Sequence, residues 1–259
     1  MSLVCYSSNL HIIGNASSLP PRLPFLSPVL RALRIDGTKD QERKNLGDDG
    51  VSETDASFRY IMVCLSYRGY WTSRGRPSER GIAKDAIAAL EWIASQPRED
   101  PTCRVPVILW GQSIGAGVAT KLAASHELLP REVQIRTLIL ETPFTNIRDM
   151  LVTIYPQKWL PYRYLWPFLW NHLDSWRALE QVSQKSSIPT PNIVILEAEK
   201  DELVPKSHGD TLEKRCIDLG LSVKRHVIRG ALHSEVMSRP EGRTIEAEAI
   251  GAVGTMGRS

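Results

Sequence analysis

Short apolar runs alternate with helix-patterned segments along the chain, and this alternation limits most strongly the folds that it can adopt. The apolar runs cover residues 60–66, 105–110, 135–141, 192–199 and 223–229. Between them, apolar residues recur at helical spacing after Ser78, over about 118–129 and over about 207–219. Such alternation predicts an α/β fold, with a mostly parallel sheet flanked by helices on both faces.

Length and composition indicate a single globular domain over residues 1–259. The chain is 42% hydrophobic, which is enough to build one sizeable core. The 32 basic and 29 acidic residues give a net charge of only +3, which disfavours nucleic acid as a partner. Cysteines occur at four distant positions without C-x-x-C spacing, a pattern that disfavours a structural metal site or a disulfide framework.

No apolar run approaches the roughly 20 residues of a membrane-spanning helix. The first ten residues also lack the basic start and apolar run of a secretory signal. We therefore expect an intracellular protein, either cytoplasmic or bound peripherally to a membrane.

Three segments depart from the alternating pattern. Residues 35–58 hold seven acidic and three basic residues with almost nothing apolar, and we expect an acidic disordered insertion there. Residues 254–259 are expected to form a flexible tail. The segment 144–190 begins with nine of the chain's eighteen aromatic residues, all within 144–176. This density favours an aromatic-rich lid over an apolar pocket, and the alternative is a helical hairpin whose aromatic side chains pack on the core.

A possible nucleophile lies between one predicted strand and the following helix. Residues 111–115 read Gly-Gln-Ser-Ile-Gly, which fits the pattern G-x-S-x-G. In this context a sharp turn exposes the serine hydroxyl, and small residues after the turn let the helix pack closely. Ser113 is therefore a candidate nucleophile, and the alternative is an ordinary serine at a helix entry.

A serine hydroxyl needs a base to remove its proton and an acid to orient that base. Asp201 follows the apolar run 192–199, and His233 follows the run 223–229. The order serine, aspartate, histidine, with each residue just beyond a strand end, is typical of an α/β-hydrolase. Taken singly, Asp201 fits a surface-loop acid and His233 a turn histidine. Two other acids follow no clear strand and are weaker candidates, namely Asp149 and Asp174.

Cleavage of an ester also needs amide donors for the developing oxyanion. The residue after the nucleophile, Ile114, supplies one such amide. The amide of Asn15, which follows the short apolar run 10–13, is the candidate for the second. Asn15 also begins an N-glycosylation sequon, but nothing marks the chain as secreted.

Taken together, these motifs resemble the α/β-hydrolase superfamily, specifically its bud-emergence-type branch with its ABHD depalmitoylase and lysophospholipid-lipase relatives. The resemblance covers about residues 14–252. It rests on the segments Gly14-Asn15-Ala16, Ser66-Tyr67-Arg68-Gly69-Tyr70, Ser78-Glu79-Arg80-Gly81, 111–119, 200–205 and 230–233. It implies that Ser113 is the nucleophile, Asp201 the orienting acid and His233 the base, with oxyanion amides from Asn15 and Ile114. It also implies that no metal or cofactor is required.

Two departures from the family pattern bear on function. Ile13 stands where relatives usually have a histidine, and we expect the sheet to lack the first two strands of the usual fold.

The leading hypothesis is a serine hydrolase that cleaves an ester or thioester of a small molecule, a lipid or an acylated protein, with peripheral membrane contact through the aromatic lid. The alternatives are an inactive scaffold that acts as an interaction protein and a serine peptidase of the same superfamily.

Overall fold

The computed structural model describes residues 6–12, 22–44, 59–97, 102–154, 172–184 and 189–256. Within these ranges six strands form one sheet, and every neighbouring pair runs parallel. The strands are β1 (Tyr6–Ile12), β2 (Arg59–Leu65), β3 (Val105–Gln112), β4 (Val133–Glu141), β5 (Asn192–Ala198) and β6 (Val223–Ile228). Their order across the sheet is β2-β1-β3-β4-β5-β6. The predicted parallel sheet is confirmed, and the loss of two further strands stays a prediction.

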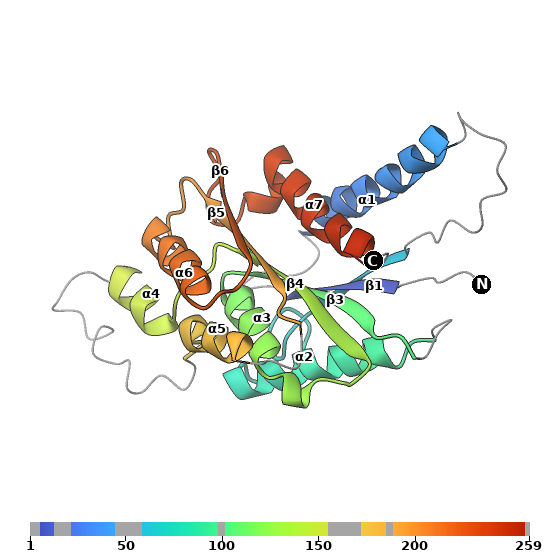
Figure 1. Ribbon diagram of the computed structural model, residues 1–259. Coiled ribbons are helices and arrows are strands. Elements are labelled where there is room, and N and C mark those ends of the chain that lie inside the picture. Colours follow the sequence, from blue (N-terminus) through green and yellow to red (C-terminus); the bar gives the residue numbers. More distant parts are fainter. Residues whose placement is uncertain are drawn as a thin grey trace.

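Helices cover both faces of this sheet (Figure 1). Helices α1 and α7 lie on one face, whereas α2, α3, α5 and α6 lie on the other. The helices are α1 (Leu23–Lys44), α2 (Glu79–Ala94), α3 (Ile114–Ala124), α4 (Ile147–Ile154), α5 (Ser175–Ser183), α6 (Lys206–Asp218) and α7 (Pro240–Met256). Two short 3-10 turns complete the described elements, η2 (His126–Leu128) and η5 (Val236–Ser238). The arrangement confirms the predicted α/β class.

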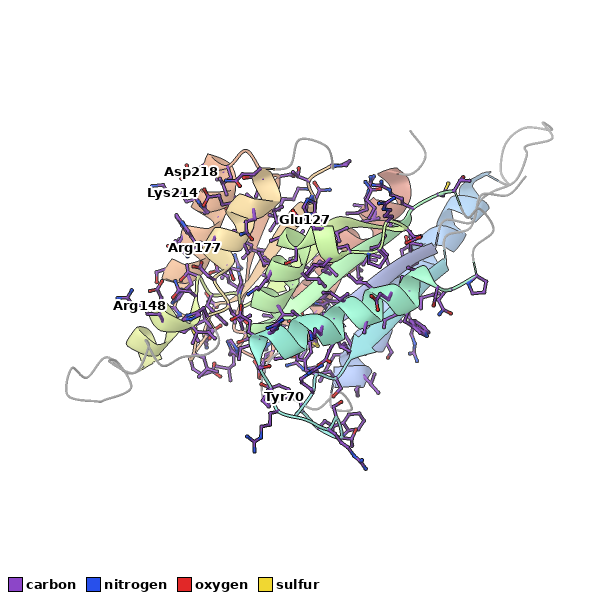
Figure 2. All side chains as sticks on the ribbon, turned by 90° about the horizontal axis from the view of Figure 1, so that it is seen from below. Tyr70, Glu127, Arg148, Arg177, Lys214 and Asp218 are labelled. Atoms are coloured by element: carbon purple, nitrogen blue, oxygen red, sulfur yellow. The ribbon has the colours of Figure 1, made fainter. Side chains whose placement is uncertain are left out.

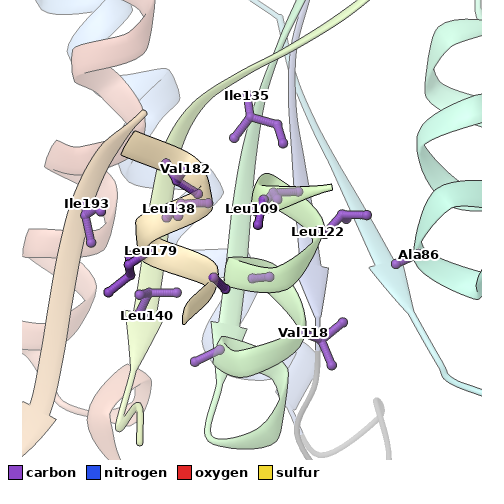
Figure 3. Close-up of a cluster of buried hydrophobic side chains, with 14 of the residues drawn as sticks. Ala86, Leu109, Val118, Leu122, Ile135, Leu138, Leu140, Leu179, Val182 and Ile193 are labelled. Atoms are coloured by element: carbon purple, nitrogen blue, oxygen red, sulfur yellow. The ribbon is translucent and has the colours of Figure 1, made fainter. Parts of the chain in front are cut away.

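The alternation of side chains along each strand supplies two separate cores. On β4, Leu138 and Leu140 point into the core beneath α3 and α5, and Ile139 points into the core beneath α1 and α7. Figure 3 shows the first of these cores. Ala116 and Ala119 of α3 are fully buried there, so this helix approaches the sheet closely. Each fully buried leucine or isoleucine stabilises the fold by roughly 2 kcal/mol. The two packed cores therefore hold the strands, and with them the loops at their carboxyl ends, in place.

The start of α2 follows the local signals in the sequence. The hydroxyl of Ser78 caps the helix by accepting a hydrogen bond from the Gly81 amide at 3.2 Å. Glu79 in the first turn complements the positive end of the helix dipole. The apolar positions predicted to face the core, Ile82, Ala86, Leu90 and Ile93, are all buried.

The structure corrects two predicted boundaries. Residues 35–44 of the expected disordered insertion belong to α1, because the first half of this helix is anchored by the buried side chains of Leu26, Val29 and Leu33. Once a helix is nucleated, each added residue gains a backbone hydrogen bond. Similarly, α7 continues to Met256, into the expected flexible tail. The remainder of both segments, 45–58 and 257–259, lies outside the described residues.

The predicted lid is described only at its two ends. Phe144 is buried in the core, and Trp176 stacks under the guanidinium of Arg215, with 4.5 Å between the charge and the ring centre. The other seven aromatic residues of this segment fall in 155–171, outside the described residues. The lid therefore stays a prediction.

Charged side chains gather at the periphery of α5 and α6. Figure 2 shows Arg177, Lys214 and Asp218 on the outer sides of these helices.

None of the helices in the described ranges is both long and apolar enough to cross a membrane.

Candidate active site

Ser113 occupies a strained turn between β3 and α3. Its backbone has φ 53° and ψ −116°, a region that a residue with a side chain rarely adopts. A Cβ atom at Gly111 would overlap the carbonyl of Gly115 and would lie 2.6 Å from the amide nitrogen of Ala116. The turn is also tied to the next strand, because the Ser113 amide donates to the Glu141 carbonyl at 2.9 Å. This tight geometry leaves Ser113 partly exposed at the carboxyl end of the strand.

Asp201 and His233 form a buried pair. The Nδ1 atom of His233 lies 2.9 Å and 3.0 Å from the two carboxylate oxygens of Asp201. The side chain of His233 is only 10% exposed, and that of Asp201 only 5%. The carboxylate is itself held in place, since it accepts hydrogen bonds from the amides of Leu203 at 2.9 Å and Val204 at 2.7 Å. An oriented carboxylate of this kind fixes the tautomer and the direction of the imidazole.

The three loops that carry these residues meet at one edge of the sheet, because they follow the carboxyl ends of the parallel strands β3, β5 and β6. The Lys200 amide donates to the Ala231 carbonyl at 2.9 Å and so joins the second and third loops. The Gln112 side chain donates to the main-chain carbonyl of His233 at 3.2 Å. The residue immediately before Ser113 therefore contacts the residue that carries the imidazole.

Of the two predicted oxyanion donors, Ile114 lies within the described residues, and its role stays a prediction. Ile114 is the first residue of α3, where amide groups have no acceptor within the helix and the helix dipole is positive. Its amide is therefore suited to an anion. Asn15 lies outside the described residues, and its role stays a prediction.

The weaker acid candidates have local partners of their own. Asp149 accepts hydrogen bonds from the Thr145 hydroxyl at 2.9 Å and from the Asn146 side chain at 2.7 Å. Asp174 caps α5 by accepting from the Arg177 amide at 3.0 Å. Both carboxylates thus serve helix starts, and the structure pairs His233 with Asp201.

A buried polar network beneath Ser113 was not predicted from the sequence. Arg22 donates to the Gln112 side chain, and the Trp110 indole donates to Glu141. Burial raises the pKa of Glu141 to about 7, although the charges of Arg22 and His233 and the indole hydrogen bond act against this rise. Burial lowers the pKa of Arg22, and the charge of Glu141 partly restores it. Because Arg22 and Gln112 are 90 positions apart, no local pattern could reveal their contact.

One further contact had a visible signal in the sequence. Glu202 directly follows Asp201, and its carboxylate accepts a hydrogen bond from the His233 amide at 3.0 Å. Two consecutive acids after a strand end therefore both reach the histidine loop. In the described ranges, no group of three or more histidine, cysteine, aspartate or glutamate side chains could hold a metal ion.

Comparison with known proteins identifies relatives for part of the chain. No family model matches it. The lysophosphatidylserine lipase ABHD12 of Danio rerio is 38% identical over 161 residues, which are 61% of this chain and 40% of that protein. The chain thus spans less than half the length of this curated relative.

Solved structures match over nearly the whole chain at low sequence identity. A putative hydrolase from Agrobacterium vitis has a TM-score of 0.60 at 15% identity and covers 95% of this chain and 87% of its own. An inhibited esterase B from Lactobacillus rhamnosis has a TM-score of 0.59 at 14% identity and covers 96% of this chain and 78% of its own. These structural similarities show the fold of the chain. The similarity to a lipase comes from the sequence comparison. The chain therefore has an α/β-hydrolase fold, and over 61% of its length it is similar in sequence to the lysophosphatidylserine lipase ABHD12.

Proposed function

We propose that the protein is a serine hydrolase that cleaves a carboxylic ester or thioester of a lipid or an acylated protein. The single observation that supports this proposal best is the placement of Ser113 on a strained, partly exposed turn, at the sheet edge where Asp201 holds His233. In the proposed reaction, His233 takes the proton of the Ser113 hydroxyl as its oxygen attacks the carbonyl carbon. The Ile114 amide, and by expectation the Asn15 amide, would stabilise the negative charge on the carbonyl oxygen.

The tetrahedral intermediate then collapses, and protonated His233 delivers its proton to the leaving alcohol or thiol. Water, activated by the same imidazole, cleaves the acyl-enzyme and regenerates Ser113. Asp201 stabilises the imidazolium in both halves of the cycle. Apart from the substrate and water, these steps use only side chains and amides of the chain itself.

The choice of substrate class rests on similarity. Several sequence relatives are named lysophosphatidylserine lipases, and solved structures with a similar fold include esterases. The expected aromatic lid suits an acyl chain, and we expect peripheral membrane contact through it. A serine peptidase has weaker support, because neither the relatives nor the solved structures named above are peptidases.

The test is labelling of the purified chain with a fluorophosphonate probe, which reacts with activated serines. We expect labelling of the native chain and none of Ser113→Ala, with both chains showing the same thermal unfolding. A folded native chain that resists the probe would instead indicate an inactive scaffold. Labelling that persists in Ser113→Ala would place the nucleophile elsewhere.

A further inference from the structure

The Asp201 contact alone does not determine where the His233 ring lies. That contact is made at one ring atom, Nδ1, and a ring held at one point still moves with its main chain. A base must stay within hydrogen-bond reach of the nucleophile, and a misplacement of about 1 Å can cost roughly 100-fold in rate. The main chain of His233 therefore needs anchors of its own.

One anchor is the Gln112 side chain, which is 2% exposed. Its amide group donates to the His233 carbonyl at 3.2 Å, and its oxygen accepts from Arg22. A buried carboxamide is unfavourable unless its donors and acceptors are satisfied, and an apolar residue would pack at this position without that cost. Because Gln112 directly precedes Ser113, this one side chain links the main chain of the base to the turn of the nucleophile.

The second anchor is Glu202, an exposed residue directly after Asp201. Its carboxylate accepts from the His233 amide at 3.0 Å. The amide of His233 is thus engaged by Glu202 in the loop after β5, and its carbonyl by Gln112 at the end of β3. A hydrogen bond to a carboxylate is among the stronger ones available to an amide.

On the basis of the proposed function, we propose that Gln112 and Glu202 are positioning residues that clamp the main chain of His233 against Ser113. Arg22 supports this clamp by holding the Gln112 carboxamide in the orientation that donates to His233. Neither residue needs to touch the substrate. The clamp therefore acts on the rate of the chemical step and leaves substrate binding unchanged.

The first test compares Glu202→Ala with Glu202→Gln, since glutamine keeps an oxygen that can accept from the His233 amide. For hydrolysis of a p-nitrophenyl ester, we expect Glu202→Ala to lower kcat about tenfold at unchanged KM. Glu202→Gln is expected to recover kcat to within about threefold of the native value. Glu132→Ala serves as the matched control, because this exposed glutamate precedes β4 at the opposite edge of the sheet.

The second test removes the other anchor. Gln112→Glu keeps an oxygen for Arg22 but loses the group that donates to His233, and we expect the rate of fluorophosphonate labelling of Ser113 to fall about tenfold. If Gln112→Glu does not fold, the comparison of Glu202→Ala with Glu202→Gln still tests the clamp, because Glu202 is exposed. Equal kcat for Glu202→Ala and the native chain, or a change in KM alone, overturns the clamp while leaving the proposed function intact. A native chain without labelling overturns both.

Discussion

At the scale of single residues, the site depends on backbone positions that admit few alternatives. Ser113 has a positive φ although it is not glycine, and the fold must compensate a cost of order 1–3 kcal/mol for such a conformation. The compensation is visible in the hydrogen bond from the Ser113 amide to Glu141 and in the absence of a side chain at Gly111. The sharp turn thus places the hydroxyl beyond the end of β3.

Gly111→Ala tests how tightly the turn is built. A methyl group there would collide with the backbone of Gly115 and Ala116, which are fixed by the start of α3. We expect the free energy of unfolding to fall by about 3 kcal/mol, and labelling of Ser113 to be lost. Urea denaturation measures the first effect. Gly220→Ala is a useful comparison because its Cβ would meet open space, so its cost would reflect only the positive φ.

Asp201→Asn tests the role of the acid in the buried pair. Asparagine has nearly the same shape, but it can present its amide group to Nδ1 and so favour the wrong tautomer of His233. We expect kcat for an ester substrate to fall about 10³- to 10⁴-fold, with little change in the unfolding midpoint. Steady-state kinetics beside thermal unfolding would check both. A loss below tenfold would contradict the assignment of Asp201.

The individual candidates could be predicted because each follows a strand end that the sequence marks clearly. Ser113, Asp201 and His233 all lie just after apolar runs, and parallel strands bring their carboxyl ends to one edge. The supporting residues could not be found in this way. Gln112 occupies a variable position of the G-x-S-x-G pattern, and Arg22 acts across a separation of 90 positions that no periodicity encodes.

At the scale of elements, the predictable parts of the fold are those with strong periodicity. The five predicted strands differ from the observed ones by no more than two residues at either end. The helices α1 and α7 were missed, because α1 contains Pro28 in its interior and α7 includes several glycines, and both residue types have low helix propensity. Packing of these two helices on each other and on the sheet outweighs their low helix propensity.

Glu79 connects elements that are distant in the chain. Its carboxylate accepts from the amides of His172 at 2.6 Å and Leu173 at 3.3 Å and pairs with Lys121 of α3. Burial by itself raises the pKa of Glu79, but these partners together bring it below its ordinary value. The start of α2 therefore holds the chain just before α5.

Glu79→Gln is expected to lower the free energy of unfolding by about 1 kcal/mol at pH 7. Because the pKa of Glu79 is lower in the folded state, its stabilising effect is present above pH about 4.5 and is lost as the pH falls further. The two chains should therefore converge in stability towards pH 3. Hydrogen exchange at the Leu173 amide offers a local readout and should accelerate in the variant. Unchanged exchange would argue against the connection.

At the scale of the whole molecule, two buried carboxyl groups lie in the core beneath α1 and α7. Glu141 and Glu246 are both fully buried, and neither oxygen of Glu246 has a hydrogen-bond partner among the described residues. Burial raises the pKa of Glu246 well above its ordinary value, and the charge of Glu141 raises it further, whereas Arg243 opposes the rise. Both groups thus bind protons more tightly in the folded chain than in the unfolded one.

This pair predicts how global stability depends on pH. Raised folded-state pKa values give stability that is fully present below pH about 4.5 and is lost as the pH rises through 7. Glu246→Gln removes one of these groups, and we expect it to be more stable than the native chain by about 1–2 kcal/mol at pH 8. Urea unfolding at pH 5.5, 7 and 8.5 should show this advantage shrinking as the pH falls. A constant difference across this range would show that Glu246 does not titrate on unfolding.

The position of β1 between β2 and β3 has a consequence for how the chain folds during synthesis. β1 is made first of the six strands, yet β3, its partner on one side, begins almost 100 residues later at Val105. Until residue 112 has left the ribosome, one edge of β1 has no strand to pair with, and pairings over such sequence separation form slowly. The neighbours β3 and β4, by contrast, are separated only by α3 and η2. We therefore expect the β3–α3–β4 unit, which carries Ser113, to fold first and to serve as the template on which β1 docks.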